Sequence, residues 1–374
     1  MARTALLTLL VLLFGAAGAD AATRAVPQGW LGVTADGPFD ASDATEWRRM
    51  ARAGVETVRT AFVWSLLQPG APGPSGPVYD FSGTDKLALA AARHGIALVP
   101  VVQGPPYWAA VHPGVFHSAP SDPGAVRQIF AALANRYGPR GSLWRERLNV
   151  PRRPITAWQV FNEPNLRGFW SVQPFHGSYV ATVEAAERGV HSVDPSATVV
   201  LAGLPNRSWE ALSAIYAAGG RGSFDAVAIH PYSRSPVNVV RIVRYARRVM
   251  RMNGDARVPI WVTEFSWPAT GEMSEAFRSN PIFGQPVSNA GQARLLGRTV
   301  RNFARARRRL GIGRLIWYTW LSREAPGSDN AFDYTGLRRI RNGAHVSSPA
   351  LRAFRRWARR LEGCAKTANA QRCR

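Results

Sequence analysis

Cysteine is scarce in this 374-residue chain, which contains only Cys364 and Cys373. Two thiols exclude a scaffold built on disulfides and any zinc or iron–sulfur site held by several thiolates. Both cysteines lie in a polar C-terminal tail, where oxidation outside the cell could close a small loop. Such a disulfide would constrain the tail and take no part in catalysis.

Lysine is nearly absent: the chain has 47 basic residues, and only Lys86 and Lys366 are lysine, so 45 are arginine. With 24 acidic residues, the formal net charge is +23. The arginine-rich stretches 301–309, 338–341 and 352–360 coincide with helical patterns of apolar residues, and we interpret them as solvated helix faces. This interpretation predicts no nucleic-acid partner. Attraction to an acidic polysaccharide or another polyanion at the cell surface stays open.

Long apolar runs are missing beyond the N-terminus. Residues 5–16 are mostly apolar and follow Arg3, and the small residues after them end in Ala19-Asp20-Ala21, an A-x-A cleavage pattern. The run is shorter than the roughly 20 residues that span a bilayer. We therefore expect residues 1–21 to be a signal peptide and the mature protein to be secreted, without a membrane anchor after cleavage.

From Trp30 to Leu361 the chain alternates short β-branched runs with longer helical patterns. The expected strands are 31–34, 57–62, 97–102, 155–161, 198–202, 226–229, 260–263 and 315–319. The expected helices are 44–52, 84–94, 123–137, 178–193, 209–218, 237–252, 291–310 and 350–361. Alternation of eight strands with eight helices predicts an α/β protein with the (β/α)8 TIM barrel fold. A single catalytic domain would span residues 30–361, followed by a tail at 362–374.

Two glutamates end hydrophobic strands of this expected barrel. Glu163 lies in the turn Asn162-Glu163-Pro164 after the fourth strand, and Glu264 follows Thr263 at the end of the seventh. Catalytic groups of this fold lie at the carboxyl ends of the strands. Hydrolysis of a glycosidic bond needs two facing carboxyl groups, one to protonate the leaving oxygen and one to act at the sugar carbon.

At these residues the sequence resembles the clan A glycoside hydrolases, which are retaining (β/α)8 glycosidases with catalytic glutamates on strands four and seven. The resemblance covers nearly all of the mature chain. Within the clan, the sequence of the loops at 64–69 and 106–109 looks most like that of family 39 xylosidase-type or family 5 cellulase-like enzymes. The motifs that carry it are, in chain order, Arg59 in the second strand, Asn162-Glu163-Pro164, His230-Pro231-Tyr232 after the sixth strand, Thr263-Glu264, and Trp317 and Trp320 in the eighth.

The resemblance implies a role for each matching residue. Glu163 would be the acid/base and Glu264 the nucleophile of a double displacement on a β-linked carbohydrate. Asn162 would hydrogen-bond the sugar 2-hydroxyl, Tyr232 would donate to Glu264, and Arg59 would keep that carboxylate ionised. The resemblance implies no metal and no organic cofactor, and we expect a monomer.

Several assignments have an alternative based on packing alone. Arg59 could pair with any acid at the barrel rim, and His230 could be a satisfied core histidine instead of contacting the sugar or orienting a carboxylate. Trp320, nearer the rim than Trp317, is the expected platform for the sugar ring. Trp64 and Trp108 could line subsites or cap the core.

Two alternative functions remain open for the whole chain. The first is a catalytically weak glycan-binding pseudoenzyme, which the intact pair of glutamates disfavours. The second is a polyanion-binding surface protein that uses its arginine-rich faces. Changes at Glu163 or Glu264 would leave the second function unaffected.

Overall fold

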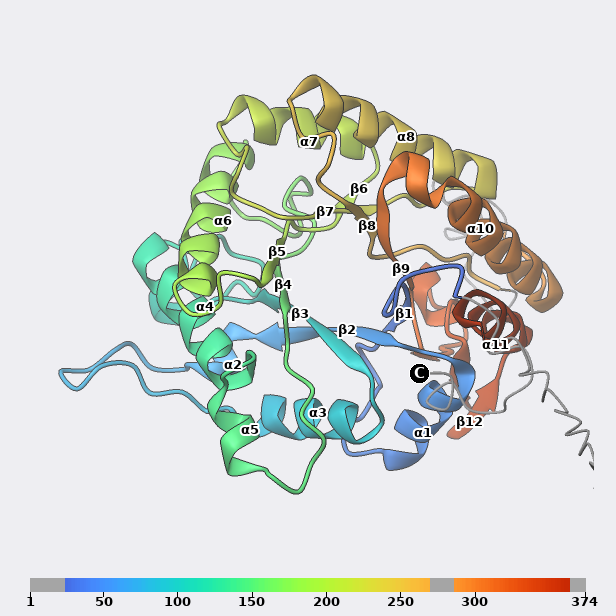
Figure 1. The fold of residues 1–374 in the computed structure, drawn as a ribbon, viewed down its shortest axis with the longest axis horizontal. Helices are drawn as coiled ribbons and strands as arrows, with labels where there is room; N and C mark the ends of the chain where they lie inside the picture. The colour runs from blue at the N-terminus through green and yellow to red at the C-terminus, as the bar shows by residue number, and fades with distance from the viewer. Residues whose placement is uncertain (1–23, 270–285, 364–374) are drawn as a thin grey trace, which may run out of the picture.

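A computed structural model describes residues 24–269 and 286–363. Its main sheet is parallel and curls into a ring with helices outside (Figure 1). Along the sheet the strands follow the order β5-β4-β3-β2-β1-β9-β8-β7-β6. In chain order the strands are β1 (Leu31–Thr34), β2 (Thr57–Val63), β3 (Ala97–Gln103), β4 (Ala157–Val160), β5 (Thr198–Val200), β6 (Leu204–Pro205), β7 (Val227–His230), β8 (Ile260–Val262) and β9 (Ile312–Trp317).

The fifth position of the ring is shared by β5 and β6, which are separated by only three residues. β6 pairs with β7, and a parallel bridge from Val200 to Ala226 joins β5 to the residue just before β7. The two ends of the sheet therefore meet, and the nine strands make eight positions around the barrel. The predicted (β/α)8 TIM barrel with one main domain is confirmed.

Each of the eight expected helices is present outside the barrel. Several begin where the sequence supplies a capping side chain: Asp43 accepts hydrogen bonds from the N–H groups of Thr45 and Glu46, and Asp122 accepts one from Gly124. The eight helices are α1 (Ala44–Ala53), α3 (Ser82–Arg93), α4 (Pro123–Tyr137), α6 (His176–His191), α7 (Ser208–Ala217), α8 (Pro236–Met252), α10 (Asn289–Leu310) and α11 (Pro349–Glu362). Shorter helices are α2 (Trp64–Leu67), α5 (Ser142–Glu146), η1 (Tyr107–Ala109) and η2 (Ala331–Tyr334).

The helical interpretation of residues 338–341 is wrong. These residues form β11 (Arg338–Arg341) in a small sheet with β10 (Leu321–Arg323) and β12 (Ala344–Ser347). The reason is the turn between β11 and β12, where Asn342 and Gly343 have φ angles of 48° and 76°. Positive φ at both central residues is the hairpin turn that Asn-Gly favours.

The small sheet is joined to the barrel through the carboxylate of Glu46 on α1. Glu46 is buried, with 2% of its surface exposed, and it accepts hydrogen bonds from Arg338 Nε at 2.9 Å and Trp320 Nε1 at 2.9 Å. The Arg338 side chain is buried as well. A buried ion pair of this kind is sensitive to the loss of one partner, because the other charge then stays in a low dielectric.

The predicted signal peptide and both cysteines lie outside the described residues. Among the helices of residues 24–269 and 286–363, none is long and apolar enough to cross a membrane.

Replacing Glu46 with Leu should lower the free energy of unfolding by about 3–5 kcal/mol, because Arg338 would be left as an uncompensated buried charge. Denaturation in guanidinium chloride measures the change. The double variant Glu46→Leu/Arg338→Met should recover most of the loss. Equal stability of the single and double variants would contradict this account of the contact.

Candidate active site

Glu163 is brought over the end of the barrel by a sharp backbone turn after β4. Phe161 and Glu163 both have positive φ angles, 59° and 48°. Residues with a Cβ rarely adopt this left-handed backbone conformation, because it costs about 1–2 kcal/mol per residue. The N–H of Glu163 donates to the carbonyl of Gly203 at 3.1 Å, which anchors the turn on the neighbouring strand position. Strained backbone of this kind clusters at functional sites.

Glu264 follows β8 by two residues, and both of its carboxylate oxygens are engaged. Arg59 Nη1 donates to Oε1 at 2.8 Å, and the Tyr232 hydroxyl donates to Oε2 at 2.7 Å. The contact with Arg59 is a charge-assisted hydrogen bond between two buried groups. The structure thus brings Arg59 and Tyr232 to Glu264, as the sequence predicts.

The Arg59 guanidinium also reaches two side chains of the β4 segment. Its Nε donates to Gln159 Oε1 at 2.9 Å, and its Nη2 donates to Asn162 Oδ1 at 2.7 Å. The second bond fixes the orientation of the Asn162 amide beside the two glutamates. Gln159 was not among the predicted site residues, although a polar side chain within the apolar run of β4 was a usable signal.

His230 lies between the two carboxyl groups. Its Nδ1 is 2.6 Å from Glu163 Oε1, and its Nε2 is 3.5 Å from Glu264 Oε1. One oxygen of each glutamate and one nitrogen of His230 all lie within 4.8 Å of one another. Carboxyl groups about 5–5.5 Å apart are typical of retaining glycosidases, whereas inverting enzymes need about 6.5–9.5 Å.

Burial gives the residues around Glu163 unusual protonation behaviour. It raises the pKa of the Glu163 carboxyl to about 7, although the charge of Arg59 acts in the opposite direction. Burial lowers the pKa of His230 to about 3, so the imidazole is neutral near pH 7. It also raises the pKa of the Tyr232 hydroxyl well above its ordinary value, so this group remains a donor. A protonated acid and a neutral histidine can therefore coexist at this site.

The same site also brings together three possible metal-ligand atoms, one each from Glu163, His230 and Glu264. Two carboxylates and an imidazole suit a divalent cation in principle. The Glu264 oxygens, however, already accept bonds from Arg59 and Tyr232. The guanidinium would repel a cation at this position, so the arrangement suits proton transfer better.

The predicted aromatic residues divide into buried and partly exposed ones. Trp64 has 1% of its surface exposed and donates to Gln68, so its assignment to a subsite is wrong and it packs in the core. Trp108 contacts the Trp64 ring edge to face at 6.0 Å and remains partly exposed. Trp108 can still line a subsite.

Trp320 does not form the expected sugar platform. It is fully buried and points to Glu46 on α1, not into the barrel mouth. Trp320 lies beyond β9, which ends at Trp317. Tyr318 remains partly exposed near the carboxyl groups, as do Tyr232 and Phe332. Burial and the charge of Glu264 both raise the pKa of the Tyr318 hydroxyl.

Phe332 of η2 lies against both tyrosines of the site. Its ring centroid is 5.5 Å from that of Tyr232 and 5.0 Å from that of Tyr318. Asp36, which follows β1, is a further carboxyl group within electrostatic range of Arg59 and Tyr318, and burial raises its pKa. None of Tyr318, Phe332 and Asp36 was among the predicted site residues, since nothing in the local sequence pattern marks them.

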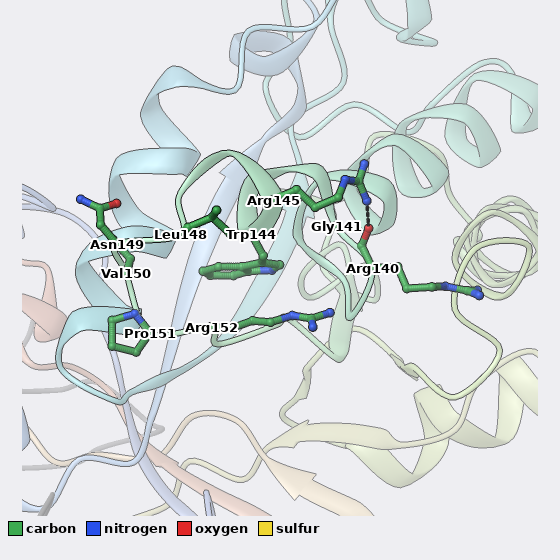
Figure 2. Close-up of a pocket in the computed structure, with 9 residues that line it drawn as sticks. All are labelled: Arg140, Gly141, Trp144, Arg145, Leu148, Asn149, Val150, Pro151 and Arg152. Carbon is green, nitrogen blue, oxygen red and sulfur yellow. Dashed lines mark hydrogen bonds between the residues drawn. The ribbon is translucent and has the colours of Figure 1, made fainter.

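A cavity of about 900 Å³ lies away from this site, beside α5 and the segment that leads into the opposite end of β4 (Figure 2). None of the predicted site residues lines it. Its lining residues are Arg140, Gly141, Trp144, Arg145, Leu148, Asn149, Val150, Pro151 and Arg152. The candidate active site is therefore assigned from the arrangement of its side chains.

Comparison with known proteins places the fold among glycoside hydrolases. No family model and no curated protein matches the chain. A family 39 glycoside hydrolase from Bacteroides cellulosilyticus WH2 aligns with a TM-score of 0.64 and 21% identity over 89% of this chain, which spans 64% of that one. A monomeric β-xylosidase from Caulobacter crescentus CB15 aligns with a TM-score of 0.63 and 19% identity, covering 89% of this chain and 69% of that one.

A glycoside hydrolase family 53 catalytic domain from Ignisphaera aggregans also aligns, with a TM-score of 0.56 and 19% identity over 88% of this chain and 96% of that one. At these identities the similarity is one of fold. The resemblance to clan A, and within it to family 39, is confirmed at that level.

The Glu163 carboxyl should titrate with a pKa of about 7. Carbon-13 NMR of protein labelled at the glutamate side chains measures it, and the Glu163→Gln variant identifies the resonance. The folded state binds this proton more tightly than the unfolded chain, whose glutamate titrates near 4.5, so stability should fall between pH 4.5 and about 7. Titration of this resonance near 4.5 would contradict the buried environment.

Proposed function

We propose that the protein is a secreted retaining β-glycosidase with Glu163 as acid/base and Glu264 as nucleophile. The observation that carries the proposal is the close approach of these two carboxyl groups, within 4.8 Å, in different environments at the ends of β4 and β8. The shared fold with family 39 enzymes supports it. Secretion rests on the signal-peptide pattern of residues 1–21, and a monomer remains our expectation.

The first step of the reaction forms a glycosyl-enzyme. A Glu264 carboxylate oxygen attacks the anomeric carbon, and the bond from that carbon to the leaving oxygen breaks. Glu163 gives its proton to the leaving oxygen and becomes a carboxylate. The geometry of Arg59 and Tyr232 holds the Glu264 oxygens in place for the attack.

The second step releases the sugar. Glu163, now ionised, takes a proton from water as the water oxygen bonds to the anomeric carbon. The bond to Glu264 breaks, so the sugar leaves with its original configuration and both carboxyl groups return to their starting states. Asn162, oriented by Arg59, is placed to bind the sugar 2-hydroxyl.

His230 suits the protonated state of Glu163 because its imidazole is neutral. In the tautomer that carries the proton on Nε2, its Nδ1 accepts the hydrogen bond of the protonated acid, and its Nε2–H faces the Glu264 oxygen at 3.5 Å. The residue thus positions the acid before it gives up its proton.

Tyr318 is the proposed platform for the sugar ring in place of Trp320. Its aromatic ring is partly exposed, and it lies within electrostatic range of Glu264 and Glu163. Phe332 packs against its edge and limits its movement. Trp108, which is partly exposed, is the candidate for a further subsite.

Replacing Glu264 with Gln should abolish turnover of aryl β-glycosides, with at least about a 10⁴-fold loss, because an amide cannot act as the ionised nucleophile. Covalent labelling by a fluorinated mechanism-based sugar, followed by mass spectrometry, should disappear as well. Glu184→Gln, a change of the same kind on α6, should leave both unchanged. Wild-type rates in Glu264→Gln would overturn the assignment, and an inactive parent would favour the glycan-binding pseudoenzyme.

Replacing Glu163 with Ala should remove the alkaline limb of the kcat/KM profile, which should lie near the Glu163 pKa of about 7. The rate falls above that pH because the acid must be protonated to act. Activated phenol leaving groups need no proton, so their release should be largely spared, and azide should rescue the second step. The control is Glu210→Ala, at an exposed acid on α7. An unchanged alkaline limb in Glu163→Ala would show that another group is the acid.

A further inference from the structure

Two neighbouring helices, α8 and α10, present an unusually uniform positive face. They lie side by side on the outside of the barrel (Figure 1), and Arg247 and Arg251 of α8 donate to carbonyl groups at the end of α10. Neither helix contains an Asp or Glu. Ten of their arginines are exposed, four on α8 and six on α10: Arg241, Arg244, Arg248, Arg251, Arg294, Arg298, Arg301, Arg305, Arg308 and Arg309.

This face differs from three other helices of the layer. Helices α1, α6 and α7 all carry glutamates, and several of these pair with an arginine or histidine of the same helix or the residue before it. By contrast, no carboxylate of the described residues forms an ion pair with any of the ten exposed arginines. An abundance of arginine across the whole chain explains the number of positive charges. It does not explain the absence of acids from two adjacent helices.

A groove of about 480 Å³ runs between the two helices. Arg244 of α8 and Arg305 and Arg309 of α10 line it with Asn302, and all three arginines are exposed. The other lining residues are apolar: Val237, Val240 and Ala306. Both helices are packed on the barrel, so the backbone positions of the three arginines are fixed relative to one another. Their side chains border a groove with an apolar floor.

The chemistry of the groove fits a carboxylate-bearing polysaccharide. A guanidinium group matches a carboxylate through two parallel hydrogen bonds. The apolar floor suits the C–H faces of sugar rings. A single-stranded nucleic acid would need several exposed rings to stack successive bases, and Tyr245 is the one aromatic side chain that α8 and α10 expose.

We propose that the face of α8 and α10 is a second carbohydrate site, which binds an acidic polysaccharide through Arg244, Arg305 and Arg309. The choice of a polysaccharide over another polyanion rests on the proposed glycosidase function. The site is separate from the carboxyl pair, so it holds the polymer without taking part in bond cleavage. Its effect is to raise the local concentration of acidic glycan around the enzyme.

The test compares binding of polygalacturonate by the parent and by the triple variant Arg244→Gln/Arg305→Gln/Arg309→Gln, using calorimetry over a series of salt concentrations. The dissociation constant of the triple variant should be at least about tenfold higher than that of the parent. The slope of log affinity against log salt concentration should become less steep by about 2, because each of the three lost ionic contacts contributes roughly 0.7, as for a single-stranded polyanion. The matched control Arg52→Gln/Arg93→Gln/Arg127→Gln removes the same charge from exposed positions on α1, α3 and α4. It should change the affinity less than about twofold.

Two outcomes would overturn the proposal. Equal weakening in the control would show attraction to net charge alone, and tighter binding of single-stranded DNA than of polygalacturonate at equal charge would assign the face to nucleic acid. Hydrolysis of aryl β-glycosides should be the same in the parent and the triple variant. Binding should also persist in Glu264→Gln, so a parent that binds polygalacturonate but hydrolyses no glycoside would refute the proposed function and support this one.

Discussion

The candidate site depends on the hydrogen bonds that the buried Arg59 guanidinium donates. This side chain extends from β2 and bonds Gln159 and Asn162 of the β4 segment and Glu264 after β8. With 1% of its surface exposed, Arg59 would be costly to bury without these partners. One buried charge therefore links side chains from three separate segments of the barrel. The position of Glu264 and the orientation of the Asn162 amide both follow from it.

The same charge acts unequally on the two catalytic candidates. Arg59 touches Glu264 directly at 2.8 Å, whereas the direct partner of Glu163 is the neutral His230. At Glu163 burial outweighs the more distant positive charge, and its pKa rises to about 7. Burial thus gives Glu163 the raised proton affinity that a general acid needs near pH 7.

Much of this site could be predicted from the sequence, and the failures have physical causes. A hydrophobic run that ends in a carboxylate locates Glu163 and Glu264, because the barrel gathers all strand ends at one rim. The prediction for Trp320 failed because a position near the rim does not determine where a side chain points: Trp320 lies beyond β9 and donates to Glu46 on α1. Tyr318 was not predicted, since its contact with Phe332 joins two separate segments of the chain. Contacts between distant segments have no local pattern in the sequence, and neither does the burial that shifts a pKa.

The residues between β5 and β6 also support the candidate site. Gly203 is one of them, and a Cβ there would come within 1.9 Å of His230 Nε2. The imidazole therefore occupies the space that a side chain at this strand position would fill. The Gly203 carbonyl also accepts the N–H of Glu163 and so anchors the strained turn. A regular fifth strand with a larger residue would displace His230 from between the carboxyl groups. Gly203 is thus a requirement of the site, because it leaves room for the histidine and its carbonyl anchors the turn that carries the acid.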